Sequence, residues 1–266
     1  MAFAVLMTKH DKGKVVAPVL RNVGLRVVEN PYWDTDQLGT FSGEKARKNS
    51  AQECALIKAK KAVEVTGMDI GLGSEGTFGG GPMPGIMNWD EEILCYYQKS
   101  TDRVIYAHAS GPFNGKTITL RSHSEAMDFV NQAEKEQALN LTVKDEFLKG
   151  VFPEQFRALL VNSAEHLTWP LIVEPDLRAM NCPQRREIIQ KAAEDLAVRL
   201  CSMCPECEAP NYVVKTREAG LPCEQCTLPT QLPLYEVLAC DECGHEEKKA
   251  VESSQASSQH CALCNP

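Results

Sequence analysis

Four C-x-x-C pairs in the last quarter of the chain restrict its folding more than any other feature of the sequence. They are Cys204/Cys207, Cys223/Cys226, Cys240/Cys243 and Cys261/Cys264. This spacing lets one tight turn direct two thiolates at a single metal ion, and eight thiolates suffice for two closed tetrahedral sites. We therefore expect residues 201–266 to form a zinc-ribbon module with two structural Zn²⁺ ions, each bound by four cysteines.

The same segment has few large apolar side chains. A segment this short cannot build a sufficient hydrophobic core, so metal binding would supply the free energy of folding. A redox role would explain one C-x-x-C pair but not four. Because a closed four-thiolate site has no open coordination position, we assign the zinc ions no catalytic role.

Two pairings of the C-x-x-C motifs are open. In sequential pairing, the first and second motifs share one ion and the third and fourth share the other, which gives two consecutive ribbons. In interleaved pairing, the first joins the third and the second joins the fourth. The segments NYVVKT (211–216) and EEKKAVE (246–252) can each form a hairpin between motifs, which favours sequential pairing. Cys201 and His245 are spare candidate ligands.

The net charge of −8 is concentrated in the cysteine-rich part, where four Lys and Arg oppose ten Asp and Glu. Binding to nucleic acid depends on neutralising phosphates, so a nucleic-acid adaptor is disfavoured, while a protein partner for the acidic tail stays open. No apolar run approaches the roughly 20 residues that span a bilayer. The opening segment MAFAVLM is too short for a signal peptide, so we expect a cytoplasmic protein. The oligomeric state is open, with a homodimer as one alternative.

The first 170 residues alternate between strand-like and helix-like segments. We expect strands at 2–7, 25–30, 68–73, 92–98 and 103–110, and helices at 17–24, 49–66 and 122–138. The order predicts an α/β domain over residues 1–170 with a mixed sheet flanked by helices. Residues 171–200 should form a connecting helical segment, with Asn181 capping a helix that begins near Pro183.

The segment GLGSEGTFGGGPMPG (71–85) contains the G-x-G-x-x-G spacing of dinucleotide-binding turns. That motif requires a helix directly after it, and the following glycines and prolines cannot begin one. Instead, we expect a strand whose end carries Ser74, Glu75 and Gly76 into a glycine-rich loop. Ligands of open α/β sheets bind at the carboxyl ends of strands, so Glu75 is a candidate metal ligand or general base. The alternative is an exposed loop acid.

Other polar residues follow the expected strands and could reach the same edge of the sheet. The loop at 8–12 offers cations for phosphates, and the loop at 34–41 offers carboxylates and a hydroxyl. Arg178 lies in a charged cluster with Glu174 and Asp176, which we interpret either as ion pairs between domains or as a contribution to binding an anion.

In this order, the motifs resemble the house-cleaning nucleoside triphosphate pyrophosphatases that hydrolyse inosine and xanthosine triphosphates. The similarity covers residues 1–110 and rests on the segments 8–12, 36–41, 54–59, 74–76 and 84–85. The chain departs from that family at Cys54, which replaces an Asn, and in a longer connection at 42–52. The whole chain also resembles an uncharacterised bacterial family with a cysteine-rich tail, through motifs such as DTDQLGTFSG, EPDLRAMNCPQR and GLPCEQC.

This resemblance implies an ITPase-like fold and a Mg²⁺-dependent hydrolase of a nucleoside triphosphate or related phosphorylated nucleotide. Glu75 and Asp36 would hold the Mg²⁺ ion and act in catalysis. The expected ligand-binding residues are Lys9, His10, Lys12, Thr40, Lys58, Ser74, Gly76 and Arg178. The alternative is a non-catalytic nucleotide-sensing or protein-binding module.

Overall fold

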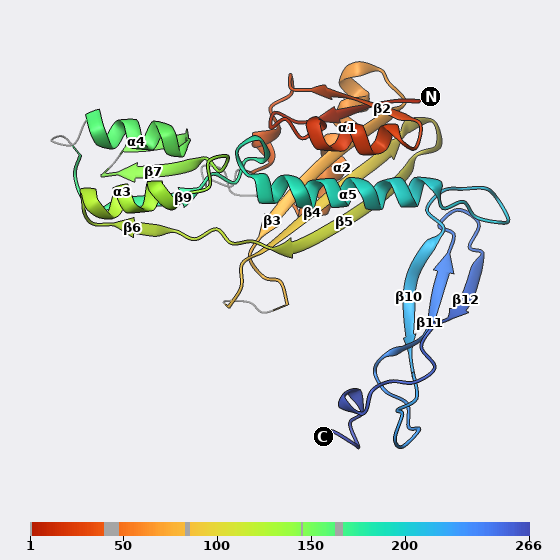
Figure 1. Ribbon diagram of the computed structural model, residues 1–266. Coiled ribbons are helices and arrows are strands. Elements are labelled where there is room, and N and C mark those ends of the chain that lie inside the picture. The colour runs from red at the N-terminus through yellow and green to blue at the C-terminus, as the bar shows by residue number, and fades with distance from the viewer. Residues whose placement is uncertain (1, 40–47, 83–85, 145, 163–166) are drawn as a thin grey trace. The chain divides into compact units, whose positions relative to one another are not determined.

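A computed structural model describes residues 2–39, 48–82, 86–144, 146–162 and 167–266 (Figure 1). Thr40 and the Pro84–Gly85 pair, both named above, lie outside the described residues. The chain divides into two compact units, Met1–Leu196 and Ala197–Pro266, and each is described here by itself. None of the described helices combines the length and the apolar character needed to cross a membrane.

The first unit contains a five-stranded mixed sheet in the order β2-β1-β3-β4-β5. Its strands are β1 (Ala2–Met7), β2 (Leu25–Asn30), β3 (Ile70–Phe78), β4 (Trp89–Gln98) and β5 (Arg103–Pro112). The first three are mutually parallel, whereas β4 runs antiparallel to β3 and β5. The mixed α/β sheet and the β4–β5 hairpin predicted from the sequence are therefore confirmed.

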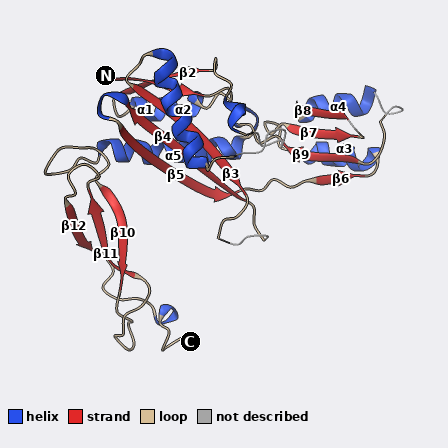
Figure 2. Ribbon diagram, turned by 180° about the vertical axis from the view of Figure 1, so that it is seen from behind, coloured by secondary structure: helices blue, strands red, loops and turns tan. Residues whose placement is uncertain are grey.

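Helices cover both faces of this sheet. Helix α1 (Gly13–Arg21) connects β1 to β2, and α2 (Ala51–Thr66) connects β2 to β3 after a short 3-10 turn at Thr35–Leu38. The two connections run in opposite directions along the sheet, so right-handed crossovers place α1 and α2 on opposite faces. Helix α5 (Pro183–Cys201) lies on the α1 face, as seen from front and back in Figures 1 and 2.

Two glycines of the G-x-G-x-x-G segment allow close packing of a helix against β3. A Cβ atom at Gly71 would lie 2.0 Å from the carbonyl oxygen of Ala59, and one at Gly73 would lie 1.9 Å from that of Ala55. Both alanines are fully buried, so the backbone of α2 lies directly against β3. The segment is an extended strand and not a turn, which agrees with the rejection of the dinucleotide-binding motif.

Several expectations about element boundaries were wrong, and two of them concern β3 and α1. Strand β3 does not end before Ser74 but continues to Phe78, because its pairing with β4 extends from Ile70 opposite Gln98 to Phe78 opposite Asp90. Helix α1 begins at Gly13, four residues before the expected start, so the loop after β1 is shorter than predicted.

Helix α2 follows its sequence signals closely. The Ser50 side chain accepts a hydrogen bond from the backbone of Glu53, and the Glu53 side chain returns one to the backbone of Ser50, which completes a capping box. Gly67 ends the helix in the left-handed conformation, with φ of 71°.

A second, four-stranded antiparallel sheet in the same unit has the order β6-β9-β7-β8. Its strands are β6 (Ile118–Leu120), β7 (Leu139–Val143), β8 (Glu146–Val151) and β9 (Leu171–Pro175). Helices α3 (His123–Gln132) and α4 (Pro153–Asn162) pack on it around a core that includes Phe156, Leu160 and Leu171. Helix α3 is capped by Ser122 as predicted but ends at Gln132, short of residue 138. A 3-10 turn at Ala179–Asn181 precedes α5, which begins at Pro183 as expected.

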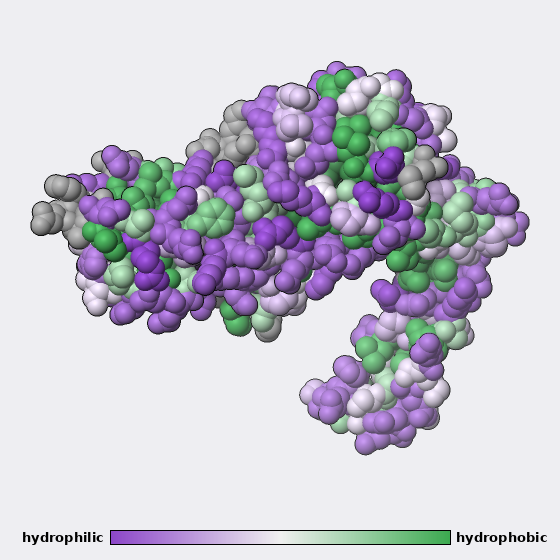
Figure 3. All heavy atoms as spheres, turned by 45° about the horizontal axis from the view of Figure 1, so that its top comes forward, coloured by the Kyte–Doolittle hydropathy of each residue, from purple (hydrophilic) through white to green (hydrophobic). Residues whose placement is uncertain are grey.

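The second unit is built on a three-stranded antiparallel sheet with β11 at its centre. Strand β10 covers Val213–Ala219, β11 covers Pro233–Ala239 and β12 covers Glu246–Ala250. A short 3-10 turn at Ser258–His260 precedes the last cysteine pair. Most of the surface of the chain visible in Figure 3 is hydrophilic.

Candidate functional site

The eight cysteines of the C-x-x-C motifs form two clusters in the second unit. The first contains Cys204, Cys207, Cys240 and Cys243, and the second contains Cys223, Cys226, Cys261 and Cys264. Within each cluster, the four Sγ atoms lie within 4.8 Å of one another. The two predicted four-cysteine groups are thus present, but sequential pairing was wrong, because the clusters are interleaved.

The three-stranded sheet explains the interleaving. Strand β10 leads from the first motif to the second, and β11 returns antiparallel to it, which places Val213 opposite Ala239 beside the first and third motifs. Strand β12 reverses direction again. The fourth motif therefore reaches the second, where Cys223 forms a β-bridge with Ala256.

All four C-x-x-C turns share one backbone hydrogen bond. In each, the carbonyl oxygen of the first cysteine accepts a hydrogen bond from the backbone amide four residues later, at 2.9–3.1 Å. The four donors are Glu208, Thr227, Gly244 and Asn265. Three of these have positive φ angles, between 58° and 73°. This closed turn directs both thiols of a motif to the same side.

The sulfur geometry fits a tetrahedral metal ion. In the first cluster, the Sγ–Sγ distances are 3.7 Å for Cys204–Cys243 and 3.6 Å for Cys207–Cys240. In the second, Cys223–Cys264 and Cys226–Cys261 are 3.9 and 3.5 Å apart. Four sulfurs about 2.3 Å from one Zn²⁺ ion would be about 3.8 Å apart. Both clusters can therefore hold a metal ion, and neither includes Cys201 or His245.

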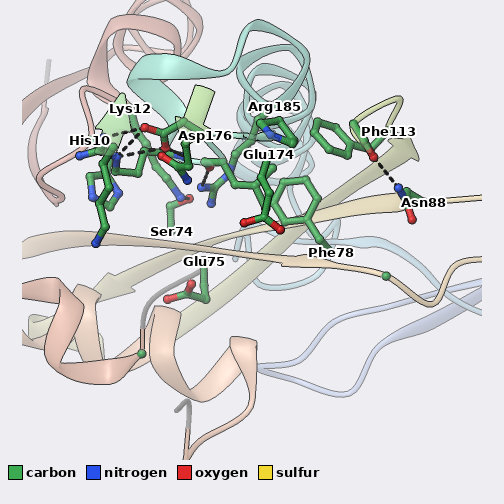
Figure 4. A pocket seen from close by; sticks show the side chains of 18 of the residues that line it. His10, Lys12, Ser74, Glu75, Phe78, Asn88, Phe113, Glu174, Asp176 and Arg185 are labelled. Atoms are coloured by element: carbon green, nitrogen blue, oxygen red, sulfur yellow. Dashed lines mark hydrogen bonds and ion pairs between the residues drawn. The ribbon is translucent and has the colours of Figure 1, made fainter. Parts of the chain in front are cut away.

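A pocket of about 670 Å³ lies in the first unit at the carboxyl ends of the parallel strands (Figure 4). The loops after β1 and β2, strand β3, the four-stranded sheet and the start of α5 all contribute to its lining. Its charged and histidine side chains are His10, Lys12, Lys58, Glu75, Lys116, Lys149, Glu174, Asp176, Arg178 and Arg185. This edge is where ligands of open α/β sheets bind.

Lys12 and Ser74 meet on the α1 face of the sheet. The ammonium of Lys12 lies 2.9 Å from Ser74 Oγ and 3.4 Å from Glu92 Oε2, and Lys12 is only 4% exposed. Burial lowers the pKa of Lys12 to about 8, although the carboxylate of Glu92 opposes this shift. The ammonium of Lys12 is thus held at the pocket by the hydroxyl of Ser74 and the carboxylate of Glu92.

Glu75 lies on the α2 face, because neighbouring residues of a strand point to opposite sides (Figure 4). Its Oε2 atom lies 2.6 Å from Nζ of Lys58, which also reaches the carbonyl oxygen of Ser74 at 3.3 Å. Its Oε1 atom accepts a hydrogen bond from the backbone amide of Gly76. Glu75 is 6% exposed, so the alternative of an exposed loop acid was wrong.

Arg185, which lines the pocket, forms a buried ion pair with Glu92. The Nε atom of Arg185 donates to Glu92 Oε1, and its Nη1 atom donates to the carbonyl oxygen of Leu177 at 2.6 Å. Gly76 makes room for this pair, since a Cβ there would lie 2.4 Å from Glu92 Oε1 and 2.7 Å from Arg185 Nη2. The pair therefore joins β4 of the central sheet to the start of α5.

Asp90 lies two residues before Glu92 on the same face of β4. It is 1% exposed, and neither of its carboxylate oxygens has a hydrogen-bond partner within the described part of the chain. Burial raises the pKa of Asp90 to about 7, and the charge of Glu92 adds to the shift.

Arg178 is held in the pocket wall next to the four-stranded sheet. Its Nε and Nη2 atoms donate to the carboxylate of Asp176 at 2.6–3.1 Å, and Asn181 Nδ2 donates to the same carboxylate at 2.7 Å. Burial by itself would raise the pKa of Asp176, but the hydrogen bonds from Arg178 outweigh it and hold the pKa below its usual value.

His10 lines the pocket together with its Lys and Arg side chains. Burial, together with the positive charges of Lys12, Arg185, Lys58 and Arg178, lowers the pKa of His10 to about 4. At neutral pH, His10 is therefore an uncharged ring in a strongly positive environment.

Six of the ten residues predicted for the ligand site line this pocket. They are His10, Lys12, Lys58, Ser74, Glu75 and Arg178. Lys9 is absent from the lining and pairs with Asp34 at 2.8 Å, and Gly76 lies behind the wall. The side chain of Asp36 and all of Thr40 fall outside what the structure describes.

Several contributors escaped the sequence-based prediction. The sequence contains one pattern that could have identified Glu92: acidic residues occupy every second position at the start of a strand whose other residues on that face are apolar. It contains no such pattern for Lys116 and Lys149. Apart from the cysteine clusters, no described group of three His, Cys, Asp or Glu residues is arranged to hold a metal ion, so a Mg²⁺ site has no support from the protein's ligands alone.

No curated protein and no solved structure shows significant similarity to this chain, so the resemblance to inosine and xanthosine triphosphate pyrophosphatases is not shown. One family model, described as a domain of unknown function (DUF6671), matches residues 58–266. The match covers most of the chain, including α2 from Lys58 onward, the strands β3 to β5, the four-stranded sheet and all eight clustered cysteines. The chain therefore belongs to the DUF6671 family.

Proposed function

We propose that the central pocket binds a phosphorylated nucleotide and that the protein hydrolyses a phosphoanhydride bond of this ligand with the help of Mg²⁺. The cysteine clusters would hold two structural Zn²⁺ ions. The observation that carries the proposal is that six Lys and Arg side chains line one pocket, in a chain whose net charge is −8.

The composition of the pocket wall supports an anionic ligand. Six Lys and Arg side chains line it against three Asp and Glu. Lysine binds phosphate as a point charge, and arginine binds it through a planar fork. The rings of Phe78 and Phe113 meet edge to face at 4.9 Å in the same wall and offer an apolar surface to a nucleobase.

The proposed catalytic role of Glu75 rests on its place at this edge of the sheet. Mg²⁺ is commonly bound through one or two carboxylates together with the phosphates of a substrate. Glu75 would be one such carboxylate, and Asp36 is the second that the family resemblance implies. The cation would polarise the phosphoanhydride and activate a water molecule. Lys12 and Lys58 would stabilise the charge that develops on the phosphates.

Phosphate release from a panel of nucleoside triphosphates with Mg²⁺ tests the proposal. We expect turnover of at least one nucleotide, with release of pyrophosphate or phosphate. Glu75→Gln should lower kcat by about 100-fold or more, because a carboxylate that binds the cation is lost. Glu64→Gln, on the exposed face of α2, is the matched control and should retain activity. No release with any nucleotide would contradict hydrolysis.

One observation favours a second candidate, a nucleotide sensor without turnover. Both carboxylate oxygens of Glu75 already have partners, Lys58 Nζ and the Gly76 amide. A cation would have to displace one of them. Binding of nucleotide without hydrolysis, measured by calorimetry on the same protein, would favour the sensor. The acidic second unit leaves a protein-binding role as a further alternative, which needs no nucleotide at all.

A further inference from the structure

Arg178 has the features of a built anion-binding position. Two of its nitrogens are fixed on the carboxylate of Asp176, which is 2% exposed and is held from another side by Asn181. The side chain of Arg178 itself is 34% exposed and lines the pocket. A guanidinium that is oriented before binding loses little freedom when an anion arrives, which favours affinity.

The neighbouring strand is shaped around this arginine. Gly150 of β8 has a φ of 70°, and a Cβ atom there would lie 2.8 Å from Arg178 Nη2. Lys149, the residue before it, also lines the pocket. The side of the pocket formed by the four-stranded sheet and the loop after β9 therefore carries its own cations, separate from Lys12 in the loop after β1 and Lys58 on α2.

Both groups of cations line the same pocket. Lys12 precedes α1 and Lys58 lies on α2, beside the five-stranded sheet, whereas Arg178 follows β9 of the four-stranded sheet. The cavity of about 670 Å³ is within the size range that accommodates one small-molecule ligand. A single ligand can thus reach both walls if its negative charge is extended.

We propose that the pocket selects ligands with a chain of two or more phosphates, in which Lys12 and Lys58 hold one end and Arg178 holds the other. This inference rests on the proposed binding of phosphorylated nucleotides and adds a selection by chain length. A single phosphate would contact one wall only, so Arg178 would contribute to the binding of long chains and not of short ones.

The test uses probes without a base: inorganic phosphate, pyrophosphate and tripolyphosphate, titrated into the zinc-loaded full chain at constant ionic strength. We expect affinity to rise with chain length. Arg178→Gln should weaken tripolyphosphate binding about tenfold or more and change phosphate binding less than about twofold, since one charged hydrogen-bonding contact is lost. Lys12→Met should weaken the binding of all three.

Two further variants keep the test decisive. Arg157→Gln removes an exposed cation of α4 away from the pocket and should leave all three affinities unchanged, which separates contact from general electrostatics. If the Gln variant fails to fold, Arg178→Lys takes its place, because this substitution keeps a positive charge beside Asp176. Arg178→Lys should still bind tripolyphosphate more weakly than the wild type does.

The outcomes separate this inference from the proposed function. An equal loss for all three probes in the Arg178 variants, or no loss, would overturn selection by chain length while nucleotide binding stands. Absence of binding by nucleotides and by all three probes would overturn both. A loss confined to the longer chains, with no hydrolysis of any nucleotide, would support the inference and refute turnover.

Discussion

The carboxylate of Glu92 lies 3.4 Å from the ammonium of Lys12, and both side chains are almost completely removed from solvent. The other oxygen of the same carboxylate accepts from Arg185. One strand residue thus compensates two buried cations, one from the loop after β1 and one from α5. Loss of one partner from such an arrangement is costly, because it leaves uncompensated charge in a low-dielectric interior.

Glu92→Gln should therefore destabilise the first unit strongly. We expect the free energy of unfolding to fall by about 3–5 kcal/mol, since Lys12 and Arg185 would remain buried and lose the carboxylate that both contact. Denaturant unfolding followed by tryptophan fluorescence measures the change. Glu91→Gln, at the adjacent exposed position, should cost less than about 0.5 kcal/mol. Equal losses of unfolding free energy for both substitutions would show that the buried ion pairs of Glu92 do not stabilise the first unit.

Gly73→Ala should separate α2 from β3. Its Cβ would be placed 1.9 Å from the carbonyl oxygen of Ala55, which belongs to the helix backbone and cannot turn away as a side chain can. We expect a loss of about 1–3 kcal/mol in unfolding free energy or a failure to fold. Unchanged thermal stability would mean that α2 and β3 are not in direct backbone contact.

Zinc content distinguishes the two cysteine pairings. Interleaved clusters predict that Cys204→Ser/Cys243→Ser removes one zinc ion per chain, because both residues belong to one cluster. Cys204→Ser/Cys226→Ser should remove two, since it damages both clusters. Metal analysis of the purified variants measures this, with Cys201→Ser as the control that keeps both ions. Sequential pairing would exchange the results of the two double variants.

The raised pKa of Asp90 predicts a specific pH dependence of stability. Its pKa in the folded protein is about 7, against an ordinary value of 3.8 for an Asp side chain. Because the folded state holds its proton more tightly than the unfolded state, this group makes stability fall as pH rises from about 4 to about 7. Asp90→Asn should reduce that fall. The control is Asp102→Asn, at an exposed turn, which should have the same pH dependence of stability as the wild type. If Asp90→Asn also had the pH dependence of the wild type, Asp90 would not be a buried carboxyl that titrates in this range.

The elements were predictable where the signal is local. Ser50 with Glu53, Gly67, Ser122 and Pro183 each mark a helix boundary through contacts within a few residues. The β4–β5 hairpin follows from its flanking apolar strands. The extension of β3 through Ser74 and Glu75 was not predictable, because it depends on hydrogen bonds to β4 that override the turn propensity of glycine.

The sequence by itself determined the identity of the eight clustered cysteines and the order of the strands and helices of the five-stranded sheet, since C-x-x-C turns and helix caps are short-range features. It did not predict the four-stranded sheet or α4, and residues 171–175, expected in a helical segment, form β9. Only the tertiary structure decided which cysteines share a cluster, because antiparallel strands bring alternate motifs together. The same holds for the pocket. Lys12, Glu92 and Arg185 lie far apart in the chain. Their pairing depends on tertiary packing, which excludes water from these side chains, so that each buried charge needs a neighbour of opposite charge.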